Sequence, residues 1–254
     1  MLANAPARRV ESVKTAIELV NTLQRLGRAT PAQLTRELDL SKSSVHNYLG
    51  TLETEGYVVN DDGVYRLGLR FLTHGAGAKK ALTIEQSVLD TVASVAETFS
   101  RTACWITEEF GRGYVIERSA VEDGPRYGSL GKRSYLHTNA PGKAVLALAD
   151  DEYVDAVCDQ HGLPERTRKT TTDRETLREE LDAIRERGFA VSDGEAMLGI
   201  VSIGVAFRDV DDRRHAIGVF DHSRNLAGTA VDDVGRRLVE IVGDLERRIR
   251  GEDR

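Results

Sequence analysis

Residues 41–68 read SKSSVHNYLGTLETEGYVVNDDGVYRLG and decide the fold of the N-terminal part of the chain. Ser41 is a favourable N-cap for a helix that starts at the next residue. One helix face then carries three apolar residues, at Val45, Leu49 and Leu52. Gly56 suits the left-handed conformation that commonly ends a helix. The first half of the stretch therefore predicts an amphipathic helix of about three turns.

Elements on both sides of this helix complete a small domain. The stripe Val13, Ile17, Val20 and Leu23 predicts an earlier helix, and Thr30-Pro31 predicts the start of a second one. After the third helix, two short apolar runs flank Asn60-Asp61-Asp62-Gly63, a typical hairpin turn. Three helices followed by a hairpin describe a winged helix-turn-helix, whose third helix lies in the DNA major groove.

The outer face of the third helix is short, polar and rich in hydrogen-bond donors. It carries the candidate DNA-binding residues Lys42, Ser43, Ser44, His46, Asn47 and Thr51. Asn47 and His46 are expected to read bases, because Asn can bond adenine at two atoms, whereas the lysine and serines suit phosphates. A solvated face of a small protein-docking module is the alternative interpretation of the same pattern.

The C-terminal part mixes helices and strands without strict alternation, which indicates an α+β domain. Two of its predicted strands, 201–207 and 215–221, each have one face of small residues, including Ser202, Gly204 and Gly218. Small side chains either leave a ligand cavity or allow a helix to pack closely on the sheet. The pattern does not choose between the two.

Composition excludes several classes of protein. The 254 residues suit one or two domains, and the net charge is +1 over residues 1–75 and −7 over residues 76–254. A net charge of −6 disfavours a general architectural DNA binder. Two cysteines give no disulfide framework, and no apolar run is long enough to span a membrane, so we expect a cytoplasmic protein. We expect no enzyme activity, no metal and no cofactor, because no nucleophile–base set, phosphate loop or ligand cluster is present.

The residues 41–68, with Tyr65-Arg66-Leu67-Gly68 at their end, resemble the DNA-binding domain of IclR-type transcriptional regulators. The C-terminal half carries three segments that match the effector domain of that family in type and order: Asn139-Ala140-Pro141-Gly142-Lys143-Ala144, Arg187-Gly188-Phe189-Ala190-Val191 and Gly199-Ile200-Val201-Ser202-Ile203. The resemblance covers nearly the whole chain, from about Arg9 to Arg250.

The resemblance implies an α+β protein with an N-terminal winged helix-turn-helix domain at 9–71 and a GAF-like effector domain at 72–254. A helical linker is expected at about 68–82. The family's ligand positions correspond to Arg126, Ser134, Ala140, Pro141, Ser192, Ser202, Gly218 and Phe220. Arg126 could bind a carboxylate or phosphate at two atoms, or be a solvated loop residue.

Two positions depart from the family pattern. Asp61-Asp62 stands at the tip of the wing, where a basic or neutral residue is common, so deep insertion into a minor groove is disfavoured. Arg66 and Arg70, nearer the base of the wing, are the better phosphate candidates. Asn47 stands where family members often carry Arg, which changes the base that this position reads.

Two functional hypotheses remain. The first is a regulator that binds a pseudo-palindromic operator in double-stranded DNA as a homodimer, or as a tetramer built from two dimers. A small organic metabolite, an anion among the options, would alter its DNA affinity or geometry. The second is a GAF-like small-molecule-binding protein or enzyme with a vestigial helix-turn-helix.

Overall fold

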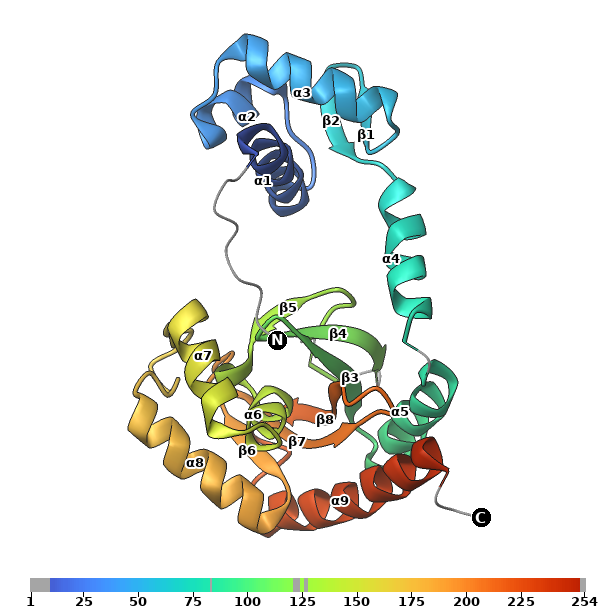
Figure 1. Cartoon of the computed structure of the whole chain (residues 1–254), viewed down its shortest axis with the longest axis vertical. Helices are drawn as coiled ribbons and strands as arrows, with labels where there is room; N and C mark the ends of the chain where they lie inside the picture. The colour runs from blue at the N-terminus through green and yellow to red at the C-terminus, as the bar shows by residue number, and fades with distance from the viewer. Residues whose placement is uncertain (1–9, 83, 121–123, 126–127, 252–254) are drawn as a thin grey trace. The chain divides into compact units, whose positions relative to one another are not determined.

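The computed structural model describes residues 10–82, 84–120, 124–125 and 128–251. The chain divides at residue 83 into two units, which are described separately below as the N-terminal unit (residues 10–82) and the C-terminal unit (residues 84–251). Figure 1 shows the elements of each. The expected linker, residues 68–82, contains a helix that groups with the N-terminal unit.

Three helices and a hairpin build the N-terminal unit, in the predicted order. They are α1 (Glu11–Leu26), α2 (Pro31–Leu38), α3 (Lys42–Thr54), β1 (Val58–Asp61) and β2 (Val64–Leu67), followed by α4 (Arg70–Lys80). Thr30 caps α2 in a capping box with Gln33, and Ser41 caps α3 by accepting a bond from the Ser44 N–H. The predicted winged helix-turn-helix is therefore confirmed.

The core of this unit lies between the three helices and the hairpin. Its buried residues include Leu19, Leu23, Leu34, Val45 and Leu49. The prediction for α1 was partly wrong, because Val13 and Ile17 are 56% and 55% exposed. The helix is rotated so that Leu19 and Leu23 enter the core, which leaves part of the predicted apolar stripe on the surface.

A six-stranded antiparallel sheet forms the centre of the C-terminal unit, in the order β5-β4-β3-β8-β7-β6. The strands are β3 (Thr102–Glu109), β4 (Arg112–Ser119), β5 (Arg133–Tyr135), β6 (Ala190–Asp193), β7 (Ile200–Arg208) and β8 (Arg214–His222). The predicted α+β class is confirmed, and β5 is a strand that the sequence pattern did not indicate.

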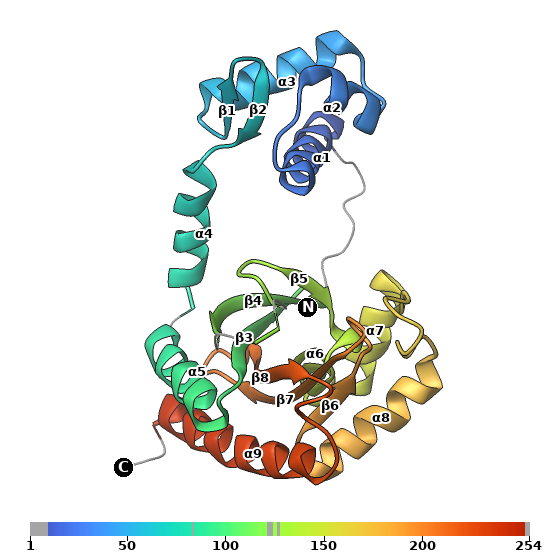
Figure 2. The ribbon, with the colours of Figure 1, turned by 180° about the vertical axis from the view of Figure 1, so that it is seen from behind.

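Helices cover both faces of this sheet. One face packs against α5 (Glu85–Phe99) and α9 (Thr229–Arg250), which lie side by side in Figures 1 and 2. The other face receives α6 (Ala140–Ala147), with α7 (Asp151–His161) and α8 (Arg174–Arg187) around it. A short 3-10 turn, Leu136–Thr138, joins β5 to the start of α6. The start of α6 thus lies against the strands that carry the small residues.

Candidate DNA-binding surface and effector cavity

Helix α3 presents the predicted DNA-binding face to solvent. Val45 and Leu49 are buried, which leaves Lys42, Ser43, His46, Asn47 and Thr51 exposed and Ser44 half-buried. A shallow hollow of about 420 Å³ runs along this face, lined by His46, Asn47, Gly50, Thr51, Thr54 and Glu55. The helix therefore offers a row of polar side chains that no other described element covers.

The charged side chains of the wing are paired in a way that the sequence pattern did not predict. The Asp61 carboxylate accepts a hydrogen bond from the Arg66 Nε at 3.0 Å and another from the Arg28 Nη2 at 2.8 Å. The hydrogen bond from Arg66 is the main cause that lowers the pKa of Asp61, and Arg28 acts in the same direction. One of the two acidic residues at the tip is therefore paired, and Arg66 is already bound to a carboxylate.

Arg70, the second predicted phosphate contact, lies at the start of α4 and contacts the end of α3. Its guanidinium donates to the backbone carbonyl and the carboxylate of Glu55 and lies 4.9 Å from the centre of the Tyr57 ring. Arg28 was not predicted as a site residue, because it stands alone between two helices and reaches the wing only through the fold.

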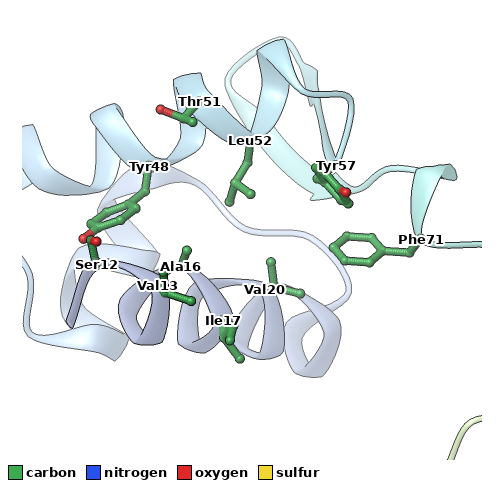
Figure 3. Close-up of a pocket in the computed structure, with 10 residues that line it drawn as sticks. All are labelled: Ser12, Val13, Ala16, Ile17, Val20, Tyr48, Thr51, Leu52, Tyr57 and Phe71. Atoms are coloured by element: carbon green, nitrogen blue, oxygen red, sulfur yellow. The ribbon is translucent and has the colours of Figure 1, made fainter. Parts of the chain in front are cut away.

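An apolar groove of about 570 Å³ crosses the N-terminal unit between α1, α3 and the start of α4. Figure 3 shows Val20 pointing from α1 toward Leu52 of α3, with Tyr57 and Phe71 at one end of the groove. Val13 and Ile17, the exposed part of the α1 stripe, also line it. The groove is therefore an apolar surface that the described residues of this unit leave open.

In the C-terminal unit, the small residues of β7 and β8 admit the start of α6. A Cβ atom placed on Gly218 would lie 2.2 Å from Pro141 Cγ, and one on Gly204 would lie 2.4 Å from Pro141 N. The Ala140 N–H donates to Ser202 Oγ at 3.2 Å. At these positions the close-packing alternative is therefore correct. The small size of Gly204 and Gly218 admits Pro141 and does not leave an open space.

The other predicted effector residues lie near this junction. Ser192 and Ser202 are paired across β6 and β7, and Phe220 is the partner of Ser202 on β8. Phe220 joins an apolar cluster with Cys104, Ile106 and Val115, against which Ala196 and Ile200 pack. Ser134 is half-buried on β5. Arg126 lies outside the described residues.

A small cavity of about 110 Å³ opens between β4, β5 and the loops before α8 and after β6. Its lining includes four cationic side chains, and none of the described lining residues is acidic: Arg112, Lys132, Arg133, Ser134, Tyr135, Thr138, Arg166 and Ala196. Ser134 is the predicted effector residue that lines this space. We refer to the space as the cationic cavity.

Arg112 is fixed in the wall of the cationic cavity. Its Nε donates to the Ser134 carbonyl at 3.0 Å, and its guanidinium lies 3.6 Å from the centre of the Tyr135 ring. Burial and the neighbouring Arg133 lower the pKa of Arg112, and burial with Arg166 lowers the pKa of Lys132. Gathered positive charges with lowered pKa values favour the binding of an anion, which would relieve their repulsion.

Buried ionisable groups elsewhere in the C-terminal unit are paired. Lys143, 2% exposed on α6, lies 2.5 Å from the carboxylates of both Glu180 and Glu195. His215 receives bonds at Nδ1 from Thr107 and Trp105 and contacts Asp209 through Nε2 at 3.2 Å. These networks satisfy their members internally.

The described residues contain no group of three or more His, Cys, Asp or Glu side chains that could hold a metal ion. Burial raises the pKa of the Cys104 thiol to about 12, which makes it a poor nucleophile. None of the helices within the described ranges is long and apolar enough to cross a membrane.

Family comparisons agree with both units. Residues 78–247 match the model described as "Bacterial transcriptional regulator IclR C-terminal", and residues 12–62 match the IclR helix-turn-helix domain. The probable HTH-type transcriptional regulator ArcR of Halobacterium salinarum is 30% identical over 253 residues, covering 97% of this chain and 96% of the relative. The KdgR regulator of Escherichia coli is 26% identical over 215 residues, covering 82% of each chain.

Solved structures share the fold at lower identity. Thermotoga maritima IclR superposes with a TM-score of 0.75 at 22% identity, covering 95% of this chain and 99% of that one. An IclR homologue from Microbacterium hydrocarbonoxydans, crystallised with 4-hydroxybenzoate, gives a TM-score of 0.76 at 21% identity over 94% and 98% of the two chains. The helix-turn-helix, the effector domain and these relatives agree: the chain belongs to the IclR family of transcriptional regulators.

Proposed function

We propose that this regulator binds its operator as a homodimer through α3 and responds to a carboxylate held in the cationic cavity. The observation that carries the DNA interface is the uncovered polar face of α3, with Asn47 at its centre. We assign DNA binding to residues 9–71 and effector binding to residues 72–254, with the linker at about 68–82. Because the protein binds DNA, we assign it to the cytoplasm.

The DNA contacts divide into two kinds. Asn47 and His46 read base edges in the major groove, and Lys42, Ser43, Ser44 and Thr51 hold the phosphates on either side. Arg66 and Arg70 contribute from the wing and the start of α4. The intact helix-turn-helix gives no support to the alternative of a vestigial domain.

A second copy of the chain covers the apolar groove of the N-terminal unit. Val13 and Ile17 are exposed there, and Leu69 and Leu72 are exposed at the start of α4, so the unit leaves an apolar surface without a partner of its own. A two-fold contact uses the same patch on both copies, and it matches the symmetry of a pseudo-palindromic operator. A tetramer would need a second contact in addition.

The effector is an anion with a small apolar body. Four cations surround the cavity, while Ala196 connects it to the apolar cluster of Phe220 and Cys104. The volume of about 110 Å³ is below the roughly 150 Å³ that accommodates benzene, so a short-chain acid fits without rearrangement. The homologue bound to 4-hydroxybenzoate, itself a carboxylate, supports this class of ligand.

The experiment is a binding titration followed by a ligand screen. Wild-type protein is titrated on tiled fragments of its own promoter region, and the bound fragment is then used with acetate, propionate and the uncharged propionamide. A carboxylate should raise the thermal unfolding midpoint by mass action and change the operator affinity, whereas propionamide should do neither. Arg112→Gln should abolish the response, and Arg178→Gln, an exposed α8 arginine outside the cavity, should preserve it.

A further inference from the structure

Two arginines from distant parts of the sequence meet at one carboxylate oxygen on the wing. Arg28 follows α1 and Arg66 lies on β2, and both donate to Oδ2 of Asp61 at the end of β1. The side chains of Arg28 and Arg66 remain 60% and 40% exposed, and that of Asp61 is 39% exposed. This group, the Arg28–Asp61–Arg66 cluster, has a net charge of +1.

The backbone fixes the places from which these side chains extend. Ala29, next to Arg28, exchanges two backbone hydrogen bonds with Tyr65, next to Arg66, at 2.9 and 2.8 Å. Asp61 is paired with Val64 across the hairpin, and the turn is closed by the bond from the Gly63 N–H to Asn60 Oδ1 at 2.8 Å. The cluster is therefore not needed to hold the hairpin together.

An exposed ion pair contributes little to folding stability, so the cluster calls for another role. Each guanidinium carries five N–H donors, and the bond to Asp61 leaves most of them available. The carboxylate restricts two long, flexible side chains to one arrangement, which lowers the entropy that they lose when they bind a further acceptor. The acceptor that suits two adjacent guanidinium groups is a phosphate.

The location of the cluster agrees with such an acceptor. Arg28 lies just before the start of α2, and the helix before a recognition helix crosses the DNA backbone. The hairpin follows α3 after a short connection. Both arms of the cluster thus come from segments that adjoin the helix in the major groove.

We propose that Asp61 is a positioning residue for DNA binding, which directs Arg28 and Arg66 onto the phosphate backbone beside the groove that α3 reads. The inference rests on the proposed DNA interface of α3. Repulsion from phosphates alone would make the Asp61 charge unfavourable for DNA binding. The proposal reverses this expectation: removing the charge weakens DNA binding.

The test compares Asp61→Asn with Asp62→Asn in the full-length protein on the operator fragment, with affinity measured over a series of salt concentrations. Asp62 is exposed, has a φ of 52° that Asn tolerates well, and contacts no arginine within the described ranges. Asp61→Asn should weaken binding by roughly 3- to 10-fold and make the salt slope shallower by about 0.9 for each phosphate that the arginines no longer neutralise. Asp62→Asn should leave the affinity unchanged or raise it up to about twofold, since it removes only a repulsive charge.

Two further variants connect the effect to the arginines. Asp61→Glu keeps the charge and should recover at least half of the lost affinity. In an Arg28→Gln/Arg66→Gln background, Asp61→Asn should no longer weaken binding. A purely structural role for Asp61 would weaken binding in this background as well, so the background separates positioning from loss of the hairpin.

The proposal is overturned if Asp61→Asn binds as tightly as wild type or more tightly with a steeper salt slope. It is also overturned if Asp61→Asn weakens binding equally in the background that lacks both arginines. Failure of the α3 interface itself gives a different result: Asn47→Ala would then bind the operator with wild-type affinity, whatever the outcome at Asp61.

Discussion

The two units differ in whether they bury ionisable side chains. The C-terminal unit buries Lys143 between two carboxylates and encloses His215 among Trp105, Thr107 and Asp209. In the described N-terminal unit, Thr22 is the buried polar residue and every charged side chain keeps contact with solvent.

The difference separates groups needed for folding from groups available for binding. A buried charge that loses its partner imposes a large desolvation cost, so its network is constrained by stability. An exposed polar side chain contributes little to folding. Residues on the surface of α3 and on the wing can therefore be substituted to suit a different operator at small cost in folding stability. Residues of the buried networks in the C-terminal unit cannot.

Removal of the Lys143 ammonium should give the largest effect. Lys143→Met leaves the buried Glu195 and the nearby Glu180 without their cation, and it should lower the free energy of unfolding by about 3–5 kcal/mol. Urea unfolding followed by circular dichroism measures this. Lys169→Met, which breaks the exposed pair with Asp193, is the matched control and should cost about 0–1 kcal/mol. Equal losses in the two variants would contradict the contrast between the units.

Acidification should destabilise the C-terminal unit through its buried histidines. Burial lowers the pKa of His137 to about 4, and burial also lowers that of His215. Below pH 6.5 the unfolded chain takes up a proton that folded His137 does not bind until about pH 4, so stability falls as the pH falls through this window. The loss from His137 should be about 2 kcal/mol between pH 7 and pH 5.

Unfolding free energies measured at several pH values check this prediction. His137→Gln retains a side-chain donor for the Pro164 carbonyl but does not titrate, so its stability should depend less steeply on pH. An unchanged pH dependence in His137→Gln would show that other groups dominate the acid sensitivity.

On the exposed face of α3 in the N-terminal unit, Asn47→Ala should affect DNA binding and not folding. It should lose about 1–3 kcal/mol on the operator and little on random DNA, because Asn47 reads a base. Its free energy of unfolding should stay within about 0.5 kcal/mol of wild type. Lys42→Ala, which removes a phosphate-binding cation, should weaken binding to both DNAs equally. Equal losses for Asn47→Ala on the two DNAs would remove its base-reading role.

The smallest effect on energy should come from the apolar groove. Ile17→Ser should leave folding stability within about 0.5 kcal/mol, since the side chain is exposed, yet raise the dimer dissociation constant about tenfold, or roughly 1.4 kcal/mol. Analytical ultracentrifugation over a concentration series measures the constant. Glu18→Ser, on α1 but outside the groove, should not change it. A dissociation constant unaffected by Ile17→Ser would place the dimer contact elsewhere.

Helices α3 and α1 illustrate what the sequence predicted well and what it did not. Periodicity identified both helices and predicted correctly that Val45 and Leu49 are buried. It failed for Val13 and Ile17, because an apolar stripe does not reveal whether the same unit covers it. The exposed face of α3 followed directly from the local pattern, since the buried positions of a helix determine its outer ones.

The residues of the cationic cavity were beyond prediction from local pattern. Arg112 lies on β4 and Arg166 in the loop before α8, and only the pairing of β4 with β5 and the path of that loop bring them together. Small residues at Gly204 and Gly218 suggested either a cavity or close packing, and only the position of Pro141 distinguished the two. Long-range contacts, which no local period encodes, decide such sites.

Trp105 gives the molecule an internal optical reporter. It is the single tryptophan of the chain, it is fully buried on β3, and its indole N–H donates to His215 at 3.3 Å. Light absorbed by indole alone therefore yields an emission signal from the C-terminal unit, while the N-terminal unit is silent. The emission can follow the effector domain in the intact, DNA-bound protein without a label, and a proton on His215 would quench it.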